Sequence, residues 1–412
     1  MHALSLIPCL LHLCVFVSSK SDHGDVSHGM VRNKWKGTGE NLTFHHEAWH
    51  PIHFPTGRGK VRIFHDEKLG VDDDIDVESP TRMTMACTGE CATPSREWNY
   101  TTEEVRKLLA FETAADDGEI SRTELVPDEK FVSYLNDWLA DEQRIAANLA
   151  EEREKRHERR RRSIIGTNTR FPIDDRKFLA KEPFSSAVKL STGCSGVLIG
   201  ENYVLTAARC IHDGKRYRVP VRQLNVGFRR GRSLKPEEIS TTEWERALIW
   251  IRVSKAFLPY DWTRLKSTNN LPLDKDYAVL ALKRGPERPY LNVSVGSPVN
   301  VEESAQLHMS ALDSPNDAAL YYRFCALQGE TAELLYQQCD GDTDAVGAGV
   351  YVRRWDGVHG RFTRKVIGVY SGEQSYELDG QPAVNNIATR ITPLKFAQIC
   401  YWLTGDYNEC NG

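Results

Sequence analysis

The stretch of sequence that decides the fold is Gly193-Cys-Ser-Gly-Val-Leu-Ile-Gly-Glu-Asn-Tyr-Val-Leu-Thr-Ala-Ala-Arg-Cys210. It holds two short runs rich in β-branched, aromatic and other apolar residues, at 196–199 and 203–206, separated by turn-forming residues. Runs of this composition and length between turns are typical of β-strands. The stretch therefore predicts two consecutive strands, flanked by Cys194 and Cys210.

The same pattern of short apolar runs separated by turns continues through the second half of the chain. Short runs rich in Val, Ile, Tyr and Leu recur at 224–228, 277–282 and 365–370, between turns that contain Gly, Pro, Asn and Asp. A helical pattern follows only at 393–403. Its apolar face is made by Leu394, Phe396, Ile399, Trp402 and Leu403. The pattern predicts an all-β domain that ends in one helix.

The quoted stretch resembles the GCSGxLI…VLTAAHC signature of chymotrypsin-fold, trypsin-like serine proteases. The resemblance implies two six-stranded β-barrels over 163–412 and a disulfide between Cys194 and Cys210. It places Arg209 where the family has its general-base histidine. An arginine stays protonated and cannot accept a proton from a hydroxyl. We expect His212 to be a surface side chain rather than a substitute base, because proton transfer needs about 3 Å between the two groups.

Two further segments resemble the rest of the catalytic triad. Asp276 stands where the family has the carboxylate that orients the histidine, and here it is expected to form an ion pair with Arg209. The segment 335–351 aligns Val346 with the reactive serine, and valine offers no nucleophile. Asp344 takes the oxyanion position, where a carboxylate opposes a developing negative charge. Ala345 replaces the aspartate that pairs with a freed N-terminus in the family.

The loss of base and nucleophile predicts a protein without proteolytic activity. Removing the serine or the histidine of such a triad costs about a millionfold in rate. The expected function is that of a secreted, non-catalytic serine protease homologue that acts through binding, with the extracellular matrix as a candidate setting. An active secreted serine-type endopeptidase with a non-standard active site is the alternative. No cofactor or metal is expected.

Shorter matching segments indicate which group within the family the chain resembles. Residues 163–171 look like the mature N-terminus of glutamyl-endopeptidase-like members, and 366–372 look like the strand beside the specificity pocket. With its leader, its basic cleavage site and its C-terminal sequence, the chain resembles the secreted serine protease 23 and 35 group, and within it more closely the inactive branch. The resemblance makes two further disulfides plausible: Cys325 with Cys339, and Cys400 with Cys410.

The N-terminus indicates secretion. Residues 1–19 have the apolar run and small terminal residues of a signal peptide, and no later apolar run is long enough to span a membrane. Of the 10 cysteines, Cys9 and Cys14 leave with this peptide, so an even set remains for disulfides. Cys87 and Cys91 are the only close pair, and their partners stay open. N-glycosylation sequons begin at Asn41, Asn99 and Asn292.

Residues 20–162 form the expected leader, partly disordered over about 20–94 and partly helical near 102–110 and 128–155. Thr101 and Glu104 fit a capping box for the first helix. The second helix has one apolar face. Its members are Phe131, Leu135, Trp138, Ile145 and Leu149. This face is expected to pack on its own domain rather than on a partner.

A run of arginines ends the leader. It predicts proprotein cleavage between Arg162 and Ser163, with a solvated, charged helix end as the alternative. Once cut away, the leader could itself be the functional element, which is a third possibility for the function of the chain.

The net charge and the distribution of charged residues indicate little about the binding partners of the chain. With 53 basic and 57 acidic residues the net charge is −4, which does not suggest strong nucleic-acid binding. A basic stretch over 215–232 could meet a glycosaminoglycan, and a solvated loop is the alternative. Its arginines are Arg216, Arg218, Arg222, Arg229, Arg230 and Arg232. Otherwise the expected partner is an unidentified extracellular protein.

Overall fold

The strand pairings close two barrels. The computed structural model describes residues 60–65, 85–86, 99–156, 170–230, 247–265, 271–296, 306–312, 319–356, 360–378 and 381–406, all within one unit, Trp49–Gly412. The first barrel has the antiparallel order β10-β11-β8-β7-β6-β9 and closes by pairing β9 with β10. Its strands are β6 (Ala187–Leu190), β7 (Ser195–Leu198), β8 (Tyr203–Thr206), β9 (Asn225–Arg229), β10 (Leu248–Pro259) and β11 (Ala278–Leu282).

The second barrel has the antiparallel order β17-β16-β13-β14-β15-β18 and closes by pairing β17 with β18. Its strands are β13 (Gln306–Ala311), β14 (Leu320–Glu330), β15 (Leu334–Gln337), β16 (Gly349–Asp356), β17 (Arg361–Leu378) and β18 (Gln381–Arg390). Three short strands join it: β5 (Phe171–Ile173) on β14, and β12 (Asn292–Val293) and β2 (Met85–Ala86) on β17. The predicted fold of two six-stranded barrels is confirmed.

Short helical turns and one C-terminal helix complete this part of the chain. The turns are α4 (Arg176–Leu179), η2 (Phe184–Ser186), η3 (Ala208–Cys210), η4 (Val221–Gln223), η6 (Leu273–Lys275) and η8 (Thr343–Ala345). The C-terminal helix is α6 (Pro393–Thr404). It starts at Thr392, whose side chain accepts a hydrogen bond from the Lys395 N–H, and it ends at Gly405 in a left-handed conformation, φ +79°.

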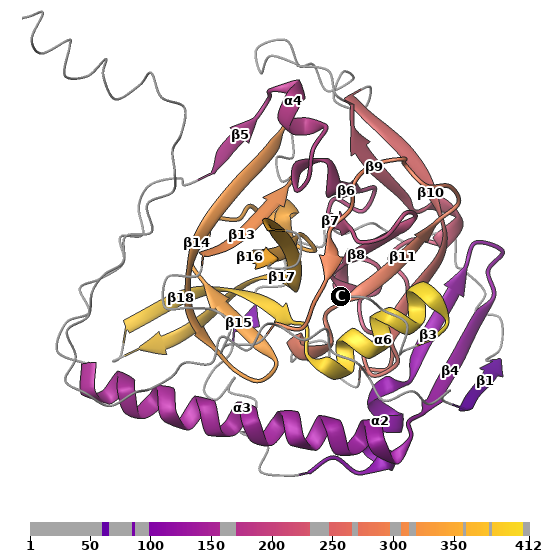
Figure 1. Cartoon of the computed structure of the whole chain (residues 1–412). Helices are drawn as coiled ribbons and strands as arrows, with labels where there is room; N and C mark the ends of the chain where they lie inside the picture. The colour runs from indigo at the N-terminus through magenta and orange to yellow at the C-terminus, as the bar shows by residue number, and fades with distance from the viewer. Residues whose placement is uncertain are drawn as a thin grey trace, which may run out of the picture. The chain divides into compact units, whose positions relative to one another are not determined.

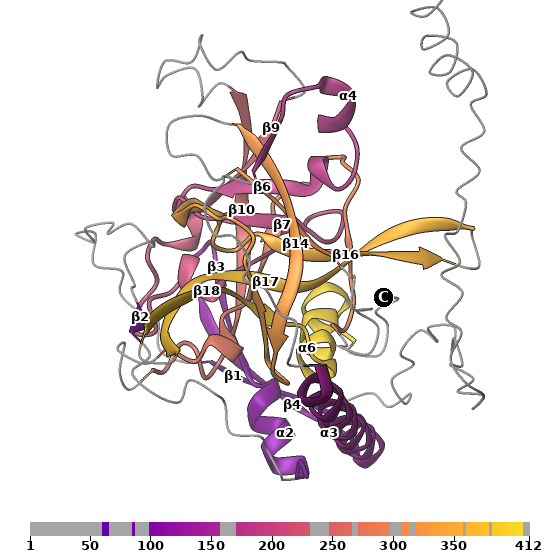
Figure 2. The same ribbon diagram turned by 90° about the vertical axis from the view of Figure 1, so that its left-hand side faces the viewer.

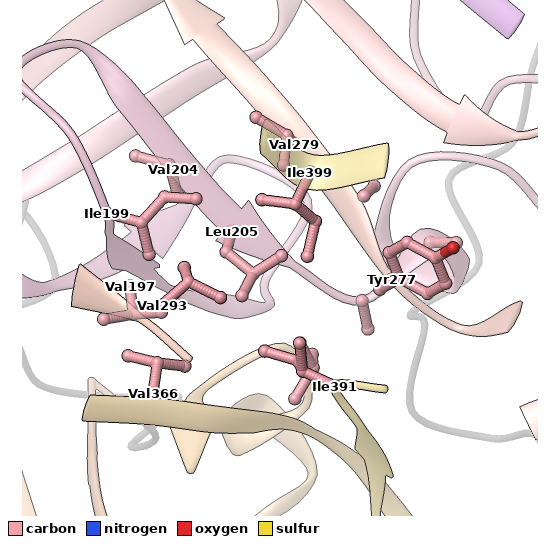
Figure 3. Close-up of a cluster of buried hydrophobic side chains, with 14 of the residues drawn as sticks. Val197, Ile199, Val204, Leu205, Tyr277, Val279, Val293, Val366, Ile391 and Ile399 are labelled. Carbon is pink, nitrogen blue, oxygen red and sulfur yellow. The ribbon is translucent and has the colours of Figure 1, made fainter. Parts of the chain in front are cut away.

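The core runs from one barrel to the other and onto α6. Apolar side chains alternate inward along the strands and are almost fully buried. Figure 3 shows Val204, Leu205 and Val279 of the first barrel near Ile391 and Val366 of the second, with Ile399 of α6 beside them. The junction between the barrels, where the family places its catalytic residues, is therefore a packed part of the core.

The leader adds strands to the first barrel as well as helices. Helix α2 (Thr102–Leu109) starts with the predicted capping box between Thr101 and Glu104. Helix α3 is Glu129–Arg156. Between them lie β3 (Phe111–Ala115) and β4 (Ile120–Val126), and with β1 (Lys60–His65) they extend the sheet from β10 in the order β10-β3-β4-β1. Figure 1 shows these three strands at the right-hand edge, next to β10, and α3 below both barrels.

Within the segment 20–94, which was expected to be irregular or partly disordered, the structure describes the two short strands β1 and β2. β1 has six residues and β2 has two. β1 pairs with β4 of the leader and β2 pairs with β17 of the second barrel.

The leader is bonded into the first barrel by a buried carboxylate on β3. The side chain of Glu112 is fully buried and accepts hydrogen bonds from the Tyr217 hydroxyl at 2.7 Å and the Thr263 hydroxyl at 3.2 Å. Arg264 Nη1 lies 3.0 Å from the same carboxylate. Removing the partners of a buried carboxylate strongly destabilises the folded protein. The leader strand is thus tied to the loops that follow β8 and β10.

Two further contacts tie the leader helices to the C-terminal part of the second barrel and to α6. Arg390, at the end of β18, donates from Nη2 to Glu142 Oε1 at 3.0 Å and from Nη1 to Glu142 Oε2 at 3.1 Å, and both side chains are buried. Gln398 of α6 donates to the Leu109 carbonyl at 3.0 Å. Phe131 and Leu135 of the predicted apolar face of α3 belong to the main core cluster, and the side chains of Ile145 and Leu149 lie outside the described residues.

Candidate catalytic centre

Arg209 is held at the end of β8 by a short turn and a disulfide. β8 ends at Thr206 and the chain enters η3, which contains Arg209 and Cys210. The predicted bridge from Cys194 to Cys210 is confirmed, with 6.0 Å between the two Cα atoms. The sequence folds this way because a strand, a tight turn and a cross-link follow one another within a few residues. The side chain at 209 is therefore fixed against the junction of the barrels.

Asp276 accepts two hydrogen bonds from Arg209. The main-chain N–H of Arg209 donates to Asp276 Oδ1 at 2.9 Å, and its guanidinium Nε donates to Oδ2 at 2.6 Å. The side chains are 5% and 0% exposed. The predicted ion pair is confirmed. The Nη2 atom of Arg209 is buried and has no hydrogen-bond partner among the described residues.

Val346 lies at the same disulfide-braced corner. Its carbonyl accepts a hydrogen bond from the Ser195 N–H at 2.8 Å and lies 3.8 Å from Cys210 Sγ. Its own N–H donates to the Thr343 carbonyl at 3.3 Å. The structure therefore brings Arg209, Asp276 and Val346 to the junction, and the isopropyl group of Val346 has no atom that can act as a nucleophile.

Gly347 makes the close approach between the barrels possible. Its φ is +91°, and a Cβ placed on it would lie 2.3 Å from the Ser195 carbonyl oxygen and 2.3 Å from Thr206 Oγ1. Only glycine fits a backbone in this conformation at this distance. The turn that carries Val346 is thus pressed directly onto β7 and β8.

Asp344 pairs with a residue that sequence reasoning missed. Its Oδ2 lies 2.5 Å from Lys189 Nζ, and its main-chain carbonyl accepts the Ser195 hydroxyl at 2.8 Å. Lys189 comes from β6 and is buried with the rest of that strand. The signal available in the sequence was a single lysine inside the apolar run Ala187-Val-Lys-Leu190. The carboxylate at the oxyanion position is therefore balanced by a fixed cation.

Known proteins match the chain along most of its length. The family model described as Trypsin matches residues 174–301. "Serine protease 23" from Homo sapiens is 38% identical over 347 residues, covering 82% of this chain and 86% of that protein. The chain belongs to the trypsin-like serine protease family. "Inactive serine protease 35" from Homo sapiens is 32% identical over 392 residues, covering 85% of this chain and 90% of that protein.

The solved structures most similar to this trypsin-like chain include a Glu endopeptidase in complex with MPD. The match has a TM-score of 0.41 and 15% identity, and covers 58% of this chain and 99% of the other.

His212 is not the surface residue that the sequence suggested. It is 1% exposed, its Nδ1 accepts a hydrogen bond from the Gly214 N–H at 3.0 Å, and its carbonyl accepts from Trp262 Nε1 at 2.9 Å. Burial lowers its pKa to about 4. The expectation was wrong because Trp262, 50 positions away in the sequence, donates to the His212 carbonyl and Tyr217 of the same loop packs against the imidazole. A neutral imidazole engaged in this way is part of the core.

The remaining disulfide and glycosylation predictions fall partly within the described residues. The Cys325–Cys339 bridge is confirmed. Cys400 is disulfide-bonded, and its expected partner Cys410 lies outside the described residues. Asn99 and Asn292 are exposed. The other positions outside the described residues are Asn41, Cys87, Cys91, Arg162, Ser163 and Arg232.

The predicted basic patch is divided by the fold. Arg229 is buried, contrary to its expected place on a basic surface, and Arg218 donates from Nε to the Arg209 carbonyl at 2.5 Å. Arg216, Arg222 and Arg230 are exposed. β9 is buried from Val226 to Arg229 on both of its faces, so Arg229 lies within the fold rather than on a surface loop.

No group of three or more His, Cys, Asp or Glu side chains that could hold a metal ion occurs among the described residues. None of the helices within these residues is both long enough and apolar enough to cross a membrane.

Proposed function

We propose that this trypsin-like protein is a secreted, non-catalytic serine protease homologue that acts by binding. The observation that carries the proposal is the buried ion pair of Arg209 with Asp276 at the position where the family places its histidine and aspartate. The guanidinium uses the carboxylate that would otherwise orient a base.

The chain lacks both the base and the nucleophile that acyl transfer needs. The first step needs a hydroxyl that attacks the carbonyl carbon and a base that takes its proton. Arg209 cannot take a proton, because a guanidinium in a protein is already protonated. Val346, at the position of the serine, has only methyl groups. Neither bond formation nor proton transfer can begin.

The oxyanion position also supports a non-catalytic role. A tetrahedral intermediate needs main-chain N–H groups aimed at its oxygen. The Val346 N–H donates instead to the Thr343 carbonyl, and the Asp344 carboxylate with its Lys189 partner occupies the adjoining position. Residual catalysis of the kind that survives the loss of a triad depends on these donors.

Secretion is supported by the covalent chemistry of the chain. The bridges Cys194–Cys210 and Cys325–Cys339 require an oxidising compartment, and the sequons at Asn99 and Asn292 lie on exposed side chains. The predicted signal peptide at 1–19 supports the same setting. We propose an extracellular protein as the partner.

Glycosaminoglycan binding through the exposed arginines is a weaker proposal, because Arg229 and Arg218 are engaged within the fold. Retention on a heparin column at physiological salt would support it, and elution in the flow-through would remove it.

A fluorophosphonate probe tests the central claim. Purified full chain is incubated with the probe beside trypsin as a positive control, and adducts are mapped by mass spectrometry. No adduct is expected on the chain, because the reagent needs an activated hydroxyl. A stoichiometric adduct on any serine or threonine would overturn the proposal and establish the active endopeptidase instead.

A further inference from the structure

Exposed rings gather on the outer face of the second barrel. Six large apolar side chains are exposed among the described residues, and five of them belong to this barrel or to the segment that lies against it. These five are Phe171, Phe178, Phe324, Trp355 and Phe362. Solvent-exposed apolar residues scattered singly need no explanation, whereas a contiguous group marks an interaction site.

Ring contacts connect the first part of this group. Phe171 of β5 stacks on Phe324 of β14, with 6.0 Å between ring centroids and 7° between planes. Phe324 is 5.9 Å from Tyr322, and Tyr322 is 5.5 Å from Phe184, which in turn meets Phe178. The rings therefore form one continuous surface over β5, β14 and the adjoining turns.

The hairpin of β16 and β17 carries the second part. Trp355 is 60% exposed and lies directly opposite Phe362, with 5.1 Å between ring centroids. The next pair on the same face is Arg353 opposite Arg364, and the Arg353 guanidinium sits 4.5 Å from the Phe362 ring. In Figure 2, β14 crosses the front of the second barrel and this hairpin projects to the right of it.

The two parts share one face of the sheet. Arg353 and Trp355 alternate outward along β16. Tyr351, two residues before Arg353, is buried and lies opposite the buried His308 of β13, which lies opposite Phe324. Burial, and to a smaller extent the charges of Arg353 and Arg364, lower the pKa of His308 to about 4. Both arginines are therefore close to the buried rings that connect the two exposed parts.

Two arginines directly opposite one another repel, so a hairpin selected for stability alone would not pair them. Glu182 reaches Arg364 only at 4.0 Å. The face thus offers positive charge beside apolar rings, and the complementary ligand is negatively charged and apolar.

The polar groups beneath the face favour a peptide over a sugar chain. His308 Nδ1 is bonded to the Tyr322 hydroxyl at 2.7 Å, and the Ser310 hydroxyl is bonded to the Tyr351 hydroxyl at 3.0 Å. His308, Ser310 and Tyr351 are buried, so these groups are not offered to the many hydroxyls of a glycan, whereas the exposed phenylalanine and tryptophan rings accommodate apolar side chains.

We propose that the outer face of the second barrel, from Phe171 and Phe324 to Trp355 and Arg353, is a docking surface for an acidic protein segment that carries apolar side chains. Carboxylates meet Arg353 and Arg364, and the apolar side chains cover the rings. The surface deepens the binding role proposed above but does not depend on the lost triad. A chain that reacts with the fluorophosphonate probe could still bind here, and a chain that does not react could fail to bind.

The test uses full chain and a labelled twelve-residue peptide, three repeats of Asp-Phe-Glu-Leu, in a fluorescence anisotropy titration. Two matched peptides serve as controls: one with lysine in place of each acidic residue, and one with serine in place of each apolar residue. We expect saturable binding of the first peptide, and binding at least tenfold weaker for either control.

Variants locate the surface. Trp355→Ser is expected to weaken binding about tenfold, as loss of a central aromatic does at interfaces. Arg353→Gln is expected to weaken it about fivefold. Arg361→Gln is the matched control, because Arg361 lies on the same hairpin but its cross-strand partner is Asp356, on the opposite face. It should change affinity less than twofold, and thermal unfolding should be similar in all three variants.

Three results would overturn the proposal. One is no binding of the acidic apolar peptide at millimolar concentration. The second is tighter binding of a heparin fragment than of the peptide, lost in the same variants, which would identify a glycan surface. The third is a wild-type dimer in sedimentation that Trp355→Ser converts to monomer, which would identify an interface between two copies of this chain.

Discussion

The carboxylate of Asp276 accepts two hydrogen bonds from one residue, Arg209, through its main-chain N–H and its guanidinium Nε. The first of these bonds depends only on the backbone, so it is available to any residue at position 209. The second depends on arginine. Asp276, which we propose corresponds to the carboxylate that orients the histidine in the family, here belongs to a buried ion pair.

Breaking this pair should destabilise the protein strongly. Asp276→Ala and Arg209→Met are each expected to cost about 3 to 5 kcal/mol of unfolding free energy, because each leaves one buried group without its partner. The double variant should cost at least about 2 kcal/mol less than the sum of the two. Guanidinium denaturation measures all three. Arg144→Met, at an exposed ion pair with Asp141, is the control and should change stability by less than about 1 kcal/mol. Additive effects of the two core substitutions would contradict coupling.

Restoring the triad alone should not restore proteolysis. Arg209→His with Val346→Ser supplies a base and a nucleophile, but the Asp344 carboxylate still faces the oxyanion position. Adding Asp344→Gly should raise the rate of peptide hydrolysis by about 10²-fold, the range associated with one oxyanion donor. The assay is cleavage of a fluorogenic peptide library. The matched control carries Arg209→His, Val346→Ala and Asp344→Gly and has no hydroxyl. If the double variant were as active as the triple variant, the role assigned to Asp344 would be wrong.

Acid should destabilise the protein through His212. Its pKa is about 4 in the folded protein, against 6.5 for an unperturbed side chain, so the unfolded chain binds more protons between these values. Stability is therefore fully present above about pH 6.5 and is lost as the pH falls toward 4, by up to about 3 kcal/mol. His212→Asn keeps an acceptor for the Gly214 N–H and does not titrate. Urea unfolding across this range should show a smaller slope for the variant, and an unchanged slope would contradict the assignment.

The leader should be needed for folding of the trypsin-like domain. Residues 163–412 expressed alone are expected to aggregate, because Phe111, Glu112 and Glu142 leave their partners on the barrels and on α6 uncovered. Co-expression with residues 20–162 should yield a one-to-one complex by gel filtration. A leader fragment with Phe111→Ala is the control and should give much less complex. A soluble, cooperatively unfolding 163–412 fragment would show that the leader is dispensable.

The features that the sequence predicts are mainly those whose contacting residues lie close together in the chain. The strands around Cys194 and Cys210 follow from local sequence patterns. The Arg209–Asp276 pair spans 67 positions and was expected because both residues stand in motifs that resemble the family. Lys189 beside Asp344 follows from neither, because 155 positions separate them and only closure of the barrels brings them together. The leader strands were missed for the same reason. β3 pairs with β10, which lies far along the chain, β4 pairs with β3, and β1 pairs with β4.

Gly347 retains, in a chain proposed to catalyse nothing, the backbone geometry that an active centre would need. Because Ser195 and Thr206 leave no room for a Cβ there, a codon change at this position would be removed by quality control in the secretory pathway rather than by loss of turnover. A glycine at this position is thus no sign of proteolytic activity. Inherited variants at this residue should be read as defects of protein abundance.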